Sequence, residues 1–165
     1  TLTVPELRRA QKQVIILSGL YGLLRPMDLV QSYRLEMGLK LSVDGAANMV
    51  GFWKERLTDG VNARLKKGEP LLNLAAQEYL KALDVKKLAG PVISPVFKEL
   101  RHDGTLKTVT VHAKKARGAM IRYALQNKAN KPEDLLGFGD LGWEATCEPP
   151  ESGNWLFSRP AEISV

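Results

Sequence analysis

A cluster of basic residues between positions 113 and 131 is the strongest candidate for chemistry in this sequence. Its six members have no Asp or Glu among them: Lys114, Lys115, Arg117, Arg122, Lys128 and Lys131. The 165 residues include 24 Lys and Arg against 18 Asp and Glu, so the other basic residues balance the acids and this cluster supplies the whole net charge of +6. Clustered cationic side chains attract phosphate groups, and we therefore expect a nucleic acid as partner.

The spacing within this cluster predicts a helix from about residue 113 to residue 129. At about 100° per residue, five of the cations fall within an arc of roughly 160°. The opposite side carries small and apolar residues that suit close packing on a sheet: Ala113, Ala116, Ala119, Met120, Tyr123 and Ala124. Cations in the first turn oppose the helix dipole at about 0.3–1 kcal/mol each, which indicates ligand binding rather than stability. The alternative is a solvated face that acids elsewhere in the fold neutralise.

A second candidate site follows the apolar residues 14–17, which we predict to be a strand buried on both faces. Residues 18–22 leave this strand at its C-terminal end, where ligands of open sheets bind. Polar and aromatic side chains crowd beside this turn: Ser18, Tyr21, Arg25, Tyr33, Arg34 and Glu36. The arginines could hold phosphates and the tyrosines could stack on a base. The alternative is an internally paired loop, in which Arg34 binds Glu36 or Asp28.

A similar arrangement follows the apolar residues 71–74. Asn73 lies at the end of this predicted strand, and Glu78 and Tyr79 come shortly after it. If the two strands are neighbours, Asn73 and Glu78 could converge with Ser18 and Arg25. A carboxylate and a tyrosine at a strand end can act as acid and base, whereas the same residues can equally cap a helix.

The other reactive residue types form no recognisable centre. His102, His112 and the single cysteine, Cys147, lack the spacing of metal ligands, and no set of nucleophile, histidine and acid stands out. We therefore predict no metal site, no cofactor and no catalytic residue. One cysteine excludes an internal disulfide and fits a reducing compartment, and no apolar run is long enough for a membrane span. These features predict a cytoplasmic protein with no membrane partner.

The elements that must position these residues do not alternate regularly along the chain. Apolar patterns predict strands at 14–17, 71–74, 92–100, 106–112, 143–148 and 155–159. Helical periodicity predicts helices at 5–12, 46–67, 78–83 and 113–129, and a short one from 131. Pro95 favours an edge or bulged position for its strand, and Asp103-Gly104 predicts a hairpin before 106–112. We expect a single α+β domain over residues 1–165, with a mixed β-sheet covered by helices.

Several segments together resemble the YaaA peroxide-stress proteins in order and spacing. They are LSGLYGLLRPMDLVQSYRLEMG (17–38), FW (52–53), NLAAQEY (73–79), VISPVF (92–97), AKKARGAMIRY (113–123) and PEDLLGF (132–138). Members of this family usually carry a further N-terminal segment, so we expect the chain to correspond to the C-terminal two thirds of such a protein.

The resemblance implies a compact domain with a YaaA-like fold and a role in the response to hydrogen peroxide. It implies a protein that limits unincorporated intracellular iron and that binds DNA through a positively charged cleft. Transferred to this sequence, the cleft is lined by Lys114, Lys115, Arg117, Arg122, Arg25 and Arg34.

Two hypotheses from different classes follow. The first is a stress protein that binds duplex or distorted DNA with little sequence preference and without catalysis, because phosphate contacts carry no sequence information. The second is an enzyme that acts on a nucleotide or a nucleic-acid base. Its pocket consists of Ser18, Tyr21, Tyr33, Glu36, Asn73 and Glu78. A third possibility, an iron-binding protein, lacks the ligands.

Overall fold

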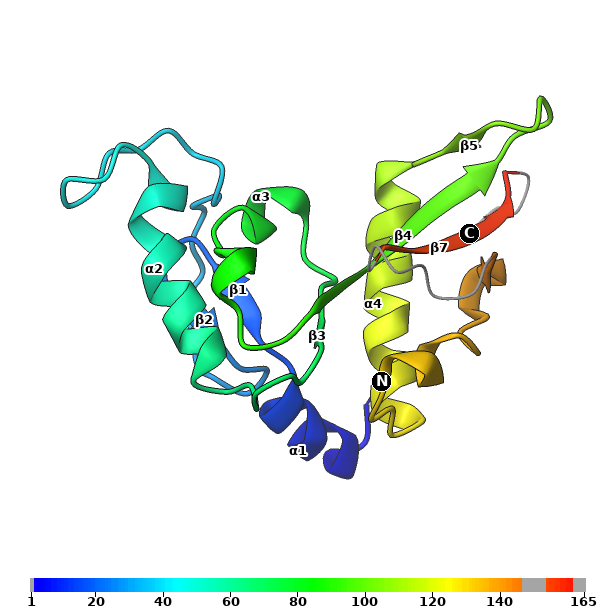
Figure 1. The fold of residues 1–165 in the computed structure, drawn as a ribbon, viewed down its shortest axis with the longest axis horizontal. Helices are drawn as coiled ribbons and strands as arrows, with labels where there is room; N and C mark the ends of the chain where they lie inside the picture. Colours follow the sequence, from blue (N-terminus) through cyan, green and yellow to red (C-terminus); the bar gives the residue numbers. More distant parts are fainter. Residues whose placement is uncertain (1, 147–153, 162–165) are drawn as a thin grey trace. The chain divides into compact units, whose positions relative to one another are not determined.

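The structure, a computed structural model, describes residues 2–146 and 154–161. The chain forms two compact units (Figure 1). The first unit contains residues 1–69 and 75–91, and the second contains residues 70–74 and 92–165. The expectation of a single domain stays a prediction, and Cys147 lies outside the described residues. No described helix has the length and apolar composition that a membrane span requires.

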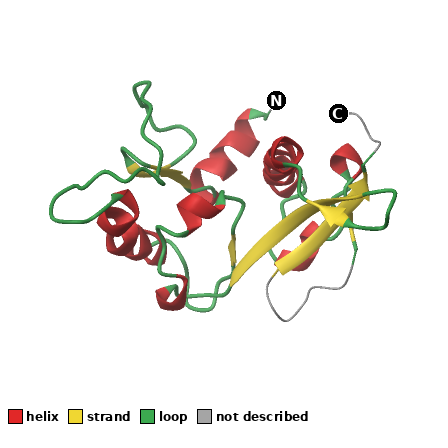
Figure 2. Ribbon diagram, turned by 90° about the horizontal axis from the view of Figure 1, so that it is seen from above, coloured by secondary structure: helices red, strands yellow, loops and turns green. Residues whose placement is uncertain are grey.

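The second unit is built on a mixed sheet. Its strand order is β3 (Leu71–Leu72), β4 (Val92–Leu100), β7 (Asn154–Pro160) and β6 (Glu144–Ala145), with β5 (Leu106–Lys107) also paired to β4. The pairs β3–β4 and β4–β7 are parallel, whereas β6–β7 and β4–β5 are antiparallel. Figure 2 shows the long strands β4 and β7 side by side, with α4 seen end-on beside them. The predicted α+β class with a mixed sheet and covering helices is confirmed.

Strand β4 has the predicted bounds but not the predicted edge position. It pairs with β7 from Ser94 to Leu100, and its opposite side pairs with β3 at one end and β5 at the other. The carbonyl of Ile93 accepts from Asn73 N on the β3 side, at 2.7 Å. The backbone N–H and C=O groups of successive residues point to alternate sides of a strand. The backbone nitrogen of Pro95 therefore points to the same side as the carbonyl of Ile93, just beyond the end of β3. Its missing N–H is therefore tolerated inside a strand that has neighbours on both sides.

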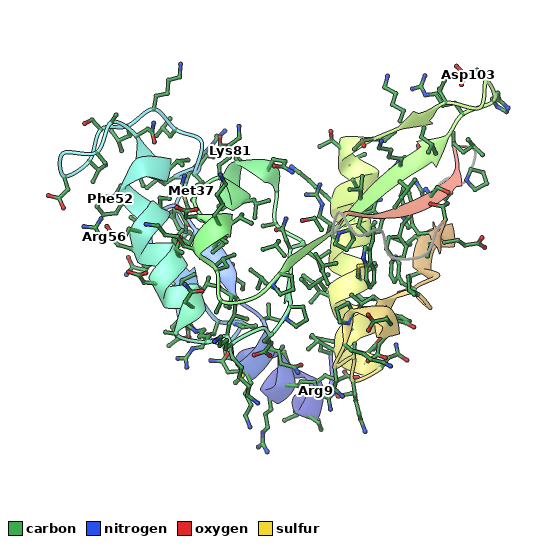
Figure 3. The ribbon with its side chains drawn as sticks, in the orientation of Figure 1. Arg9, Met37, Phe52, Arg56, Lys81 and Asp103 are labelled. Atoms are coloured by element: carbon green, nitrogen blue, oxygen red, sulfur yellow. The ribbon has the colours of Figure 1, made fainter. Side chains whose placement is uncertain are left out.

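The predicted hairpin at Asp103-Gly104 is confirmed, but the strand after it is shorter than expected. Gly104 has a φ of 78°, and its N–H donates to the carbonyl of Arg101 at 3.0 Å. Asp103 marks the tip of this hairpin (Figure 3). Strand β5 ends at Lys107, and residues 110–112, predicted as strand, form the first turn of α4 (Thr110–Gln126). The alternation of Val109 and Val111 favours a strand locally, but the packing of α4 through Ala113 and Ala116 extends the helix back to Thr110, where Val111 is 56% exposed.

Helix α4 packs its alanine side on this sheet, as predicted. Ala113, Ala116 and Met120 are buried, and Ala116 has no exposed surface. They join a core that also contains aromatic side chains from β4, β7 and the segment between α4 and β6: Phe97, Phe138, Trp143, Trp155 and Phe157. Two short helices, η2 (Pro132–Leu135) and η3 (Asp140–Gly142), complete this unit. The core fixes which side of α4 faces inward.

The first unit contains a small antiparallel sheet and four helical segments. These elements are α1 (Val4–Gln13), β1 (Ile16–Ser18), β2 (Gly22–Leu24), α2 (Met49–Asn62), α3 (Gln77–Leu80) and η1 (Val85–Lys87). The prediction of a strand buried on both faces is wrong here, because β1 pairs only with β2 among the described strands and Ile16 is 44% exposed. Strand β2 was not predicted. It is three residues long and too short for a periodic pattern to reveal.

Helix α2 is shorter than the predicted range 46–67 because its two ends are defined by asparagines. Asn48 accepts a hydrogen bond from Gly51 N at the N-terminus, and Asn62 at the other end donates to Lys87 O. Phe52 and Arg56 lie on the outer side of α2 (Figure 3), with the guanidinium 4.3 Å from the ring centroid. Met37, fully buried, belongs to the core of this unit.

Candidate functional site

The predicted basic residues of α4 lie on the side opposite its buried alanines. We call Lys114, Lys115, Arg117 and Arg122 the cationic face of α4. Lys114, Lys115 and Arg122 are exposed and Arg117 is half-buried. Within residues 2–146 and 154–161, none of the four forms an ion pair with an acidic side chain. Their charges are therefore not neutralised by carboxylates of this part of the chain, and they remain available to an anionic ligand.

Gly118 lies in the middle of the cationic face. On a helical projection it falls between Lys114 and Arg122, at about 40° from each. It is exposed, and a Cβ added there would meet no atom within 4 Å. The helix backbone is consequently bare at the centre of the cations, which permits close approach of a phosphate.

Three ionisable side chains, two of them buried, form a group at the start of α4. Glu99 on β4 and Arg159 on β7 are register partners, 4% and 2% exposed. Arg159 donates from Nε and Nη2 to Glu99 Oε1 at 3.0 and 2.6 Å, and His112 Nδ1 lies 2.6 Å from the same oxygen. Burial raises the pKa of Glu99, but the hydrogen bonds from Arg159 and His112 outweigh it and hold the pKa below its usual value. The carboxylate is therefore ionised at neutral pH.

Two further contacts complete the environment of Arg159. Its Nη1 donates to the carbonyl of Leu141 at 3.0 Å, and the guanidinium lies 4.6 Å from the ring centroid of Trp143. Glu99 and Arg159 were not among the predicted site residues, and His112 was considered only as a metal ligand. Strand alternation could have found two of them, because Glu99 shares a face with Phe97 and Arg159 shares one with Phe157.

The two arginines of the first unit differ in their pairing. Arg25 is held by Asp28, with Nη2 at 3.0 Å and Nε at 3.1 Å from Oδ1. The backbone N–H of Arg25 and its side chain donate to Asp28, and these hydrogen bonds lower the pKa of that carboxyl. Arg34 is exposed, and no ion pair involves it among the described residues. The internal pairing left open by the sequence was that of Arg34 with Glu36 or Asp28, whereas Asp28 pairs with Arg25 instead. Phosphate binding by Arg25 and Arg34 stays a prediction.

Ser18 and Tyr33 meet at the turn after β1. Ser18 Oγ accepts hydrogen bonds from the backbone N–H groups of Leu20 and Tyr21, at 3.2 and 2.9 Å, and it also contacts the hydroxyl of Tyr33. Either hydroxyl can be the donor in the hydrogen bond between Ser18 and Tyr33. Tyr21 packs edge-on against Tyr33, with ring centroids 5.4 Å apart.

The segment after Tyr33 brings the second half of the predicted pocket close to the first. Tyr79 receives a hydrogen bond from the backbone of Met37, and Glu78 Oε2 lies against Gly38. Burial raises the pKa of Tyr79, and the negative charges of Glu78 and Glu36 and the nearby Tyr33 raise it further. Two phenols and two carboxylates therefore share one neighbourhood of the first unit. The sequence analysis named Tyr79 beside Glu78 as a possible acid or base but did not include it in the predicted pocket.

Asn73, the remaining member of the predicted pocket, belongs to the second unit. Its side-chain Nδ2 donates to Ser94 Oγ at 3.0 Å. A pocket that includes Asn73 with Ser18 and Glu78 stays a prediction, as does a cleft lined by both the cationic face of α4 and Arg34. Across residues 2–146 and 154–161, no three His, Cys, Asp or Glu side chains are grouped as a metal site would require.

These features define an α+β protein in which most of the surplus positive charge is gathered on one helix. The sequence matches the family described as "Peroxide stress protein YaaA" over residues 1–148, and the chain belongs to this family. Similar proteins, each named "UPF0246 protein", occur in Flavobacterium johnsoniae (44% identity, covering 96% of this chain and 63% of the relative) and Shewanella loihica (49%, covering 87% and 56%). A third, from Hahella chejuensis, is 45% identical over 91% of this chain and 59% of the relative. The chain thus spans about three fifths of the length of these relatives.

Proposed function

We propose that this chain carries the DNA-binding surface of a peroxide-stress protein, and that DNA is held through its phosphate backbone. The observation that supports the proposal is the cationic face of α4, whose side chains lack carboxylate partners among the described residues. Phosphate contacts of this kind give affinity that falls steeply with salt and depends little on base sequence. Duplex and distorted DNA are both suitable ligands.

The proposal is tested by replacing Lys114, Lys115 and Arg117 together with glutamine. Binding of labelled single-stranded, duplex and branched DNA is followed by fluorescence anisotropy at two salt concentrations. We expect affinity to fall by roughly 30-fold or more at low salt, since three phosphate contacts are lost. The thermal midpoint should change little, because the replaced side chains make no internal ion pair among the described residues.

The matched control removes the same charge from the first unit. Lys66, Lys67 and Lys86 are exposed, and changing all three to glutamine alters the net charge equally. This control should retain DNA affinity within about threefold, apart from long-range electrostatics that salt screens. Equal affinity of the α4 triple variant and the wild-type chain would end the proposal.

We further propose that the protein limits unincorporated iron during peroxide stress. The support is membership of the peroxide stress protein family, which the matched residues 1–148 establish. The test uses cells that lack their own family member and compares unincorporated iron, measured by electron paramagnetic resonance, with and without the complete protein. No difference during peroxide exposure would contradict this role.

A second candidate function, an enzyme acting on a nucleotide or nucleic-acid base, is favoured by one observation. Tyr33, Glu36, Glu78 and Tyr79 lie together in the first unit. Calorimetric titration with nucleosides and nucleotides tests it, comparing the wild-type chain with the double variant Glu36→Gln, Glu78→Gln. Glu55→Gln with Glu133→Gln serves as the control of equal charge. Absence of heat with every ligand would remove this candidate.

A further inference from the structure

His112 connects the buried Glu99–Arg159 pair to the surface beside the cationic face of α4. It lies in the first turn of α4, one turn before Lys115, and its side chain is 27% exposed. On the helical projection it lies about 60° from Lys115, between the buried stripe and the cations. We infer that His112 is an additional phosphate contact that binds only when protonated, so that DNA affinity rises as the pH falls. The inference rests on the proposed DNA-binding function.

The chemistry begins with the nitrogen that faces Glu99. Because Nδ1 lies 2.6 Å from an ionised carboxylate oxygen, it is the protonated nitrogen of the neutral ring. The neutral ring therefore has its lone pair on Nε2, across the ring from Glu99. No described group hydrogen-bonds to Nε2. A lone pair repels a phosphate oxygen, whereas protonation converts Nε2 into a cationic donor that binds one.

Because the neighbouring charges already balance each other, the positive charge of protonated His112 is available to a ligand. Arg159 on β7 already neutralises Glu99 on β4, with two hydrogen bonds to the same oxygen that contacts His112. The three side chains together carry no net charge when His112 is neutral and one positive charge when it is protonated. Within residues 2–146 and 154–161, no further carboxylate pairs with this group to neutralise the surplus charge.

Among the described residues, the other elements packed on α4 supply no ion-pair partner for His112 besides Glu99. Short helix η3 carries Asp140, which is exposed, and presents the Leu141 carbonyl to Arg159. Short helix η2 carries Glu133 and Asp134, and Asp134 accepts from the backbone of Asn130 and Lys131. On α4 itself the nearest ionisable side chains are Lys114 and Lys115.

The test exploits the fact that the chain contains only two histidines. His112→Asn retains a side-chain donor in reach of Glu99 but cannot titrate, and His102→Asn is the matched control. Affinity for one labelled duplex is measured between pH 8 and pH 5.5 at constant ionic strength. We expect the wild-type chain and His102→Asn to gain roughly three- to tenfold in affinity at the lower pH, as one charge-assisted hydrogen bond allows. His112→Asn should show no gain.

Salt dependence provides a second readout that a purely structural role of His112 would not change. For the wild-type chain, the slope of log affinity against log salt should be steeper by about 0.9 at pH 5.5 than at pH 8, corresponding to one more phosphate contact. In His112→Asn the slope should be the same at both pH values. If this variant is unstable, NMR of the wild-type chain replaces it. The Cε1 proton of His112 should then titrate at higher pH with the duplex bound than without it.

The outcomes separate this inference from the proposed function. DNA binding that depends on Lys114, Lys115 and Arg117 but not on pH overturns the role of His112 and leaves the proposed function intact. An identical pH dependence in His112→Asn and the wild-type chain also overturns it. Failure of the wild-type chain to bind DNA at any pH overturns both.

Discussion

Glu99 is an acidic residue buried in a core of aromatic side chains, and its partners explain how that is possible. The carboxylate is 4% exposed, yet Arg159 and His112 together donate three hydrogen bonds to one of its oxygens. Arg159 in turn has the Leu141 carbonyl and the Trp143 ring as neighbours. Buried charges persist only when paired and hydrogen-bonded, and removal of one partner leaves the other uncompensated.

Replacing Glu99 with glutamine should therefore destabilise the second unit strongly. We expect the free energy of unfolding to fall by about 3–5 kcal/mol, because Arg159 would remain buried without a counter-charge. Urea unfolding at pH 7, followed by tryptophan fluorescence, measures this loss. Glu133→Gln, at an exposed position, is the control and should change stability by less than about 0.5 kcal/mol.

The difference in the free energy of unfolding between the wild-type chain and the Glu99→Gln variant should also depend on pH. The pKa of Glu99 is lowered from 4.5 in the folded chain, so the unfolded state binds more protons in this range. The stabilisation that Glu99 contributes is complete above the pKa of Glu99 in the unfolded chain, and it is lost as the pH falls through the pKa of Glu99 in the folded chain. The difference between the two proteins should thus shrink below about pH 4.5. A difference that stays constant down to pH 3 would contradict the assignment of this ion pair.

At the scale of elements, the two sides of α4 differ, because one packs on the sheet and the other carries exposed cations. One side is made of small residues that bring the backbone close to the sheet, and Ala116 there has no exposed surface. The other side carries the cations around Gly118, where there is open space. The helix is therefore fixed in rotation by its packing, and its cations are presented outward as a set.

Two substitutions on opposite sides of α4 should change stability in opposite directions. Ala116→Leu should cost about 1–3 kcal/mol, because added methylenes overpack a core that has no room for them. Gly118→Ala should add about 0.5–1 kcal/mol, because alanine favours the helix and its methyl group meets no neighbour. Thermal and urea unfolding of the two variants test this rotation of α4. Destabilisation by Gly118→Ala would show that the cationic side is packed.

At the scale of the whole molecule, the net charge of +6 is distributed very unevenly. Basic and acidic residues balance outside the segment 113–131, so the field that attracts a polyanion originates mainly from one helix. Such a field affects affinity and association rate through salt-sensitive contacts rather than through base recognition.

The salt dependence of DNA affinity at neutral pH should report the number of these contacts. With four phosphate contacts from the cationic face of α4, log affinity for duplex DNA should fall against log salt with a slope of about 3 to 4. The variant that lacks Lys114, Lys115 and Arg117 should lose about 2 to 3 from that slope. The Lys66, Lys67 and Lys86 control should keep the wild-type slope. A slope near zero for the wild-type chain would exclude phosphate binding as the main interaction.

Local sequence patterns determined the features that depend on neighbouring residues. The two sides of α4, the hairpin at Asp103-Gly104 and the bounds of β4 follow from periodicity and turn chemistry within a few residues, and the structure confirms them. The boundary between β5 and α4 was predicted wrongly, because the local alternation of Val109 and Val111 indicates a strand, whereas the packing of α4 extends the helix back to Thr110.

Only the tertiary structure decided which distant residues meet. The register that places Glu99 beside Arg159 joins segments 60 residues apart, and the contact of Tyr79 with Met37 brings the α3 segment to the loop after β2. Such pairings depend on competition among all packing arrangements of the chain, which no short window of sequence contains. For this protein, the sequence therefore specified the cationic helix. The fold decided that the buried carboxylate of Glu99 meets the imidazole of His112 in the first turn of that helix.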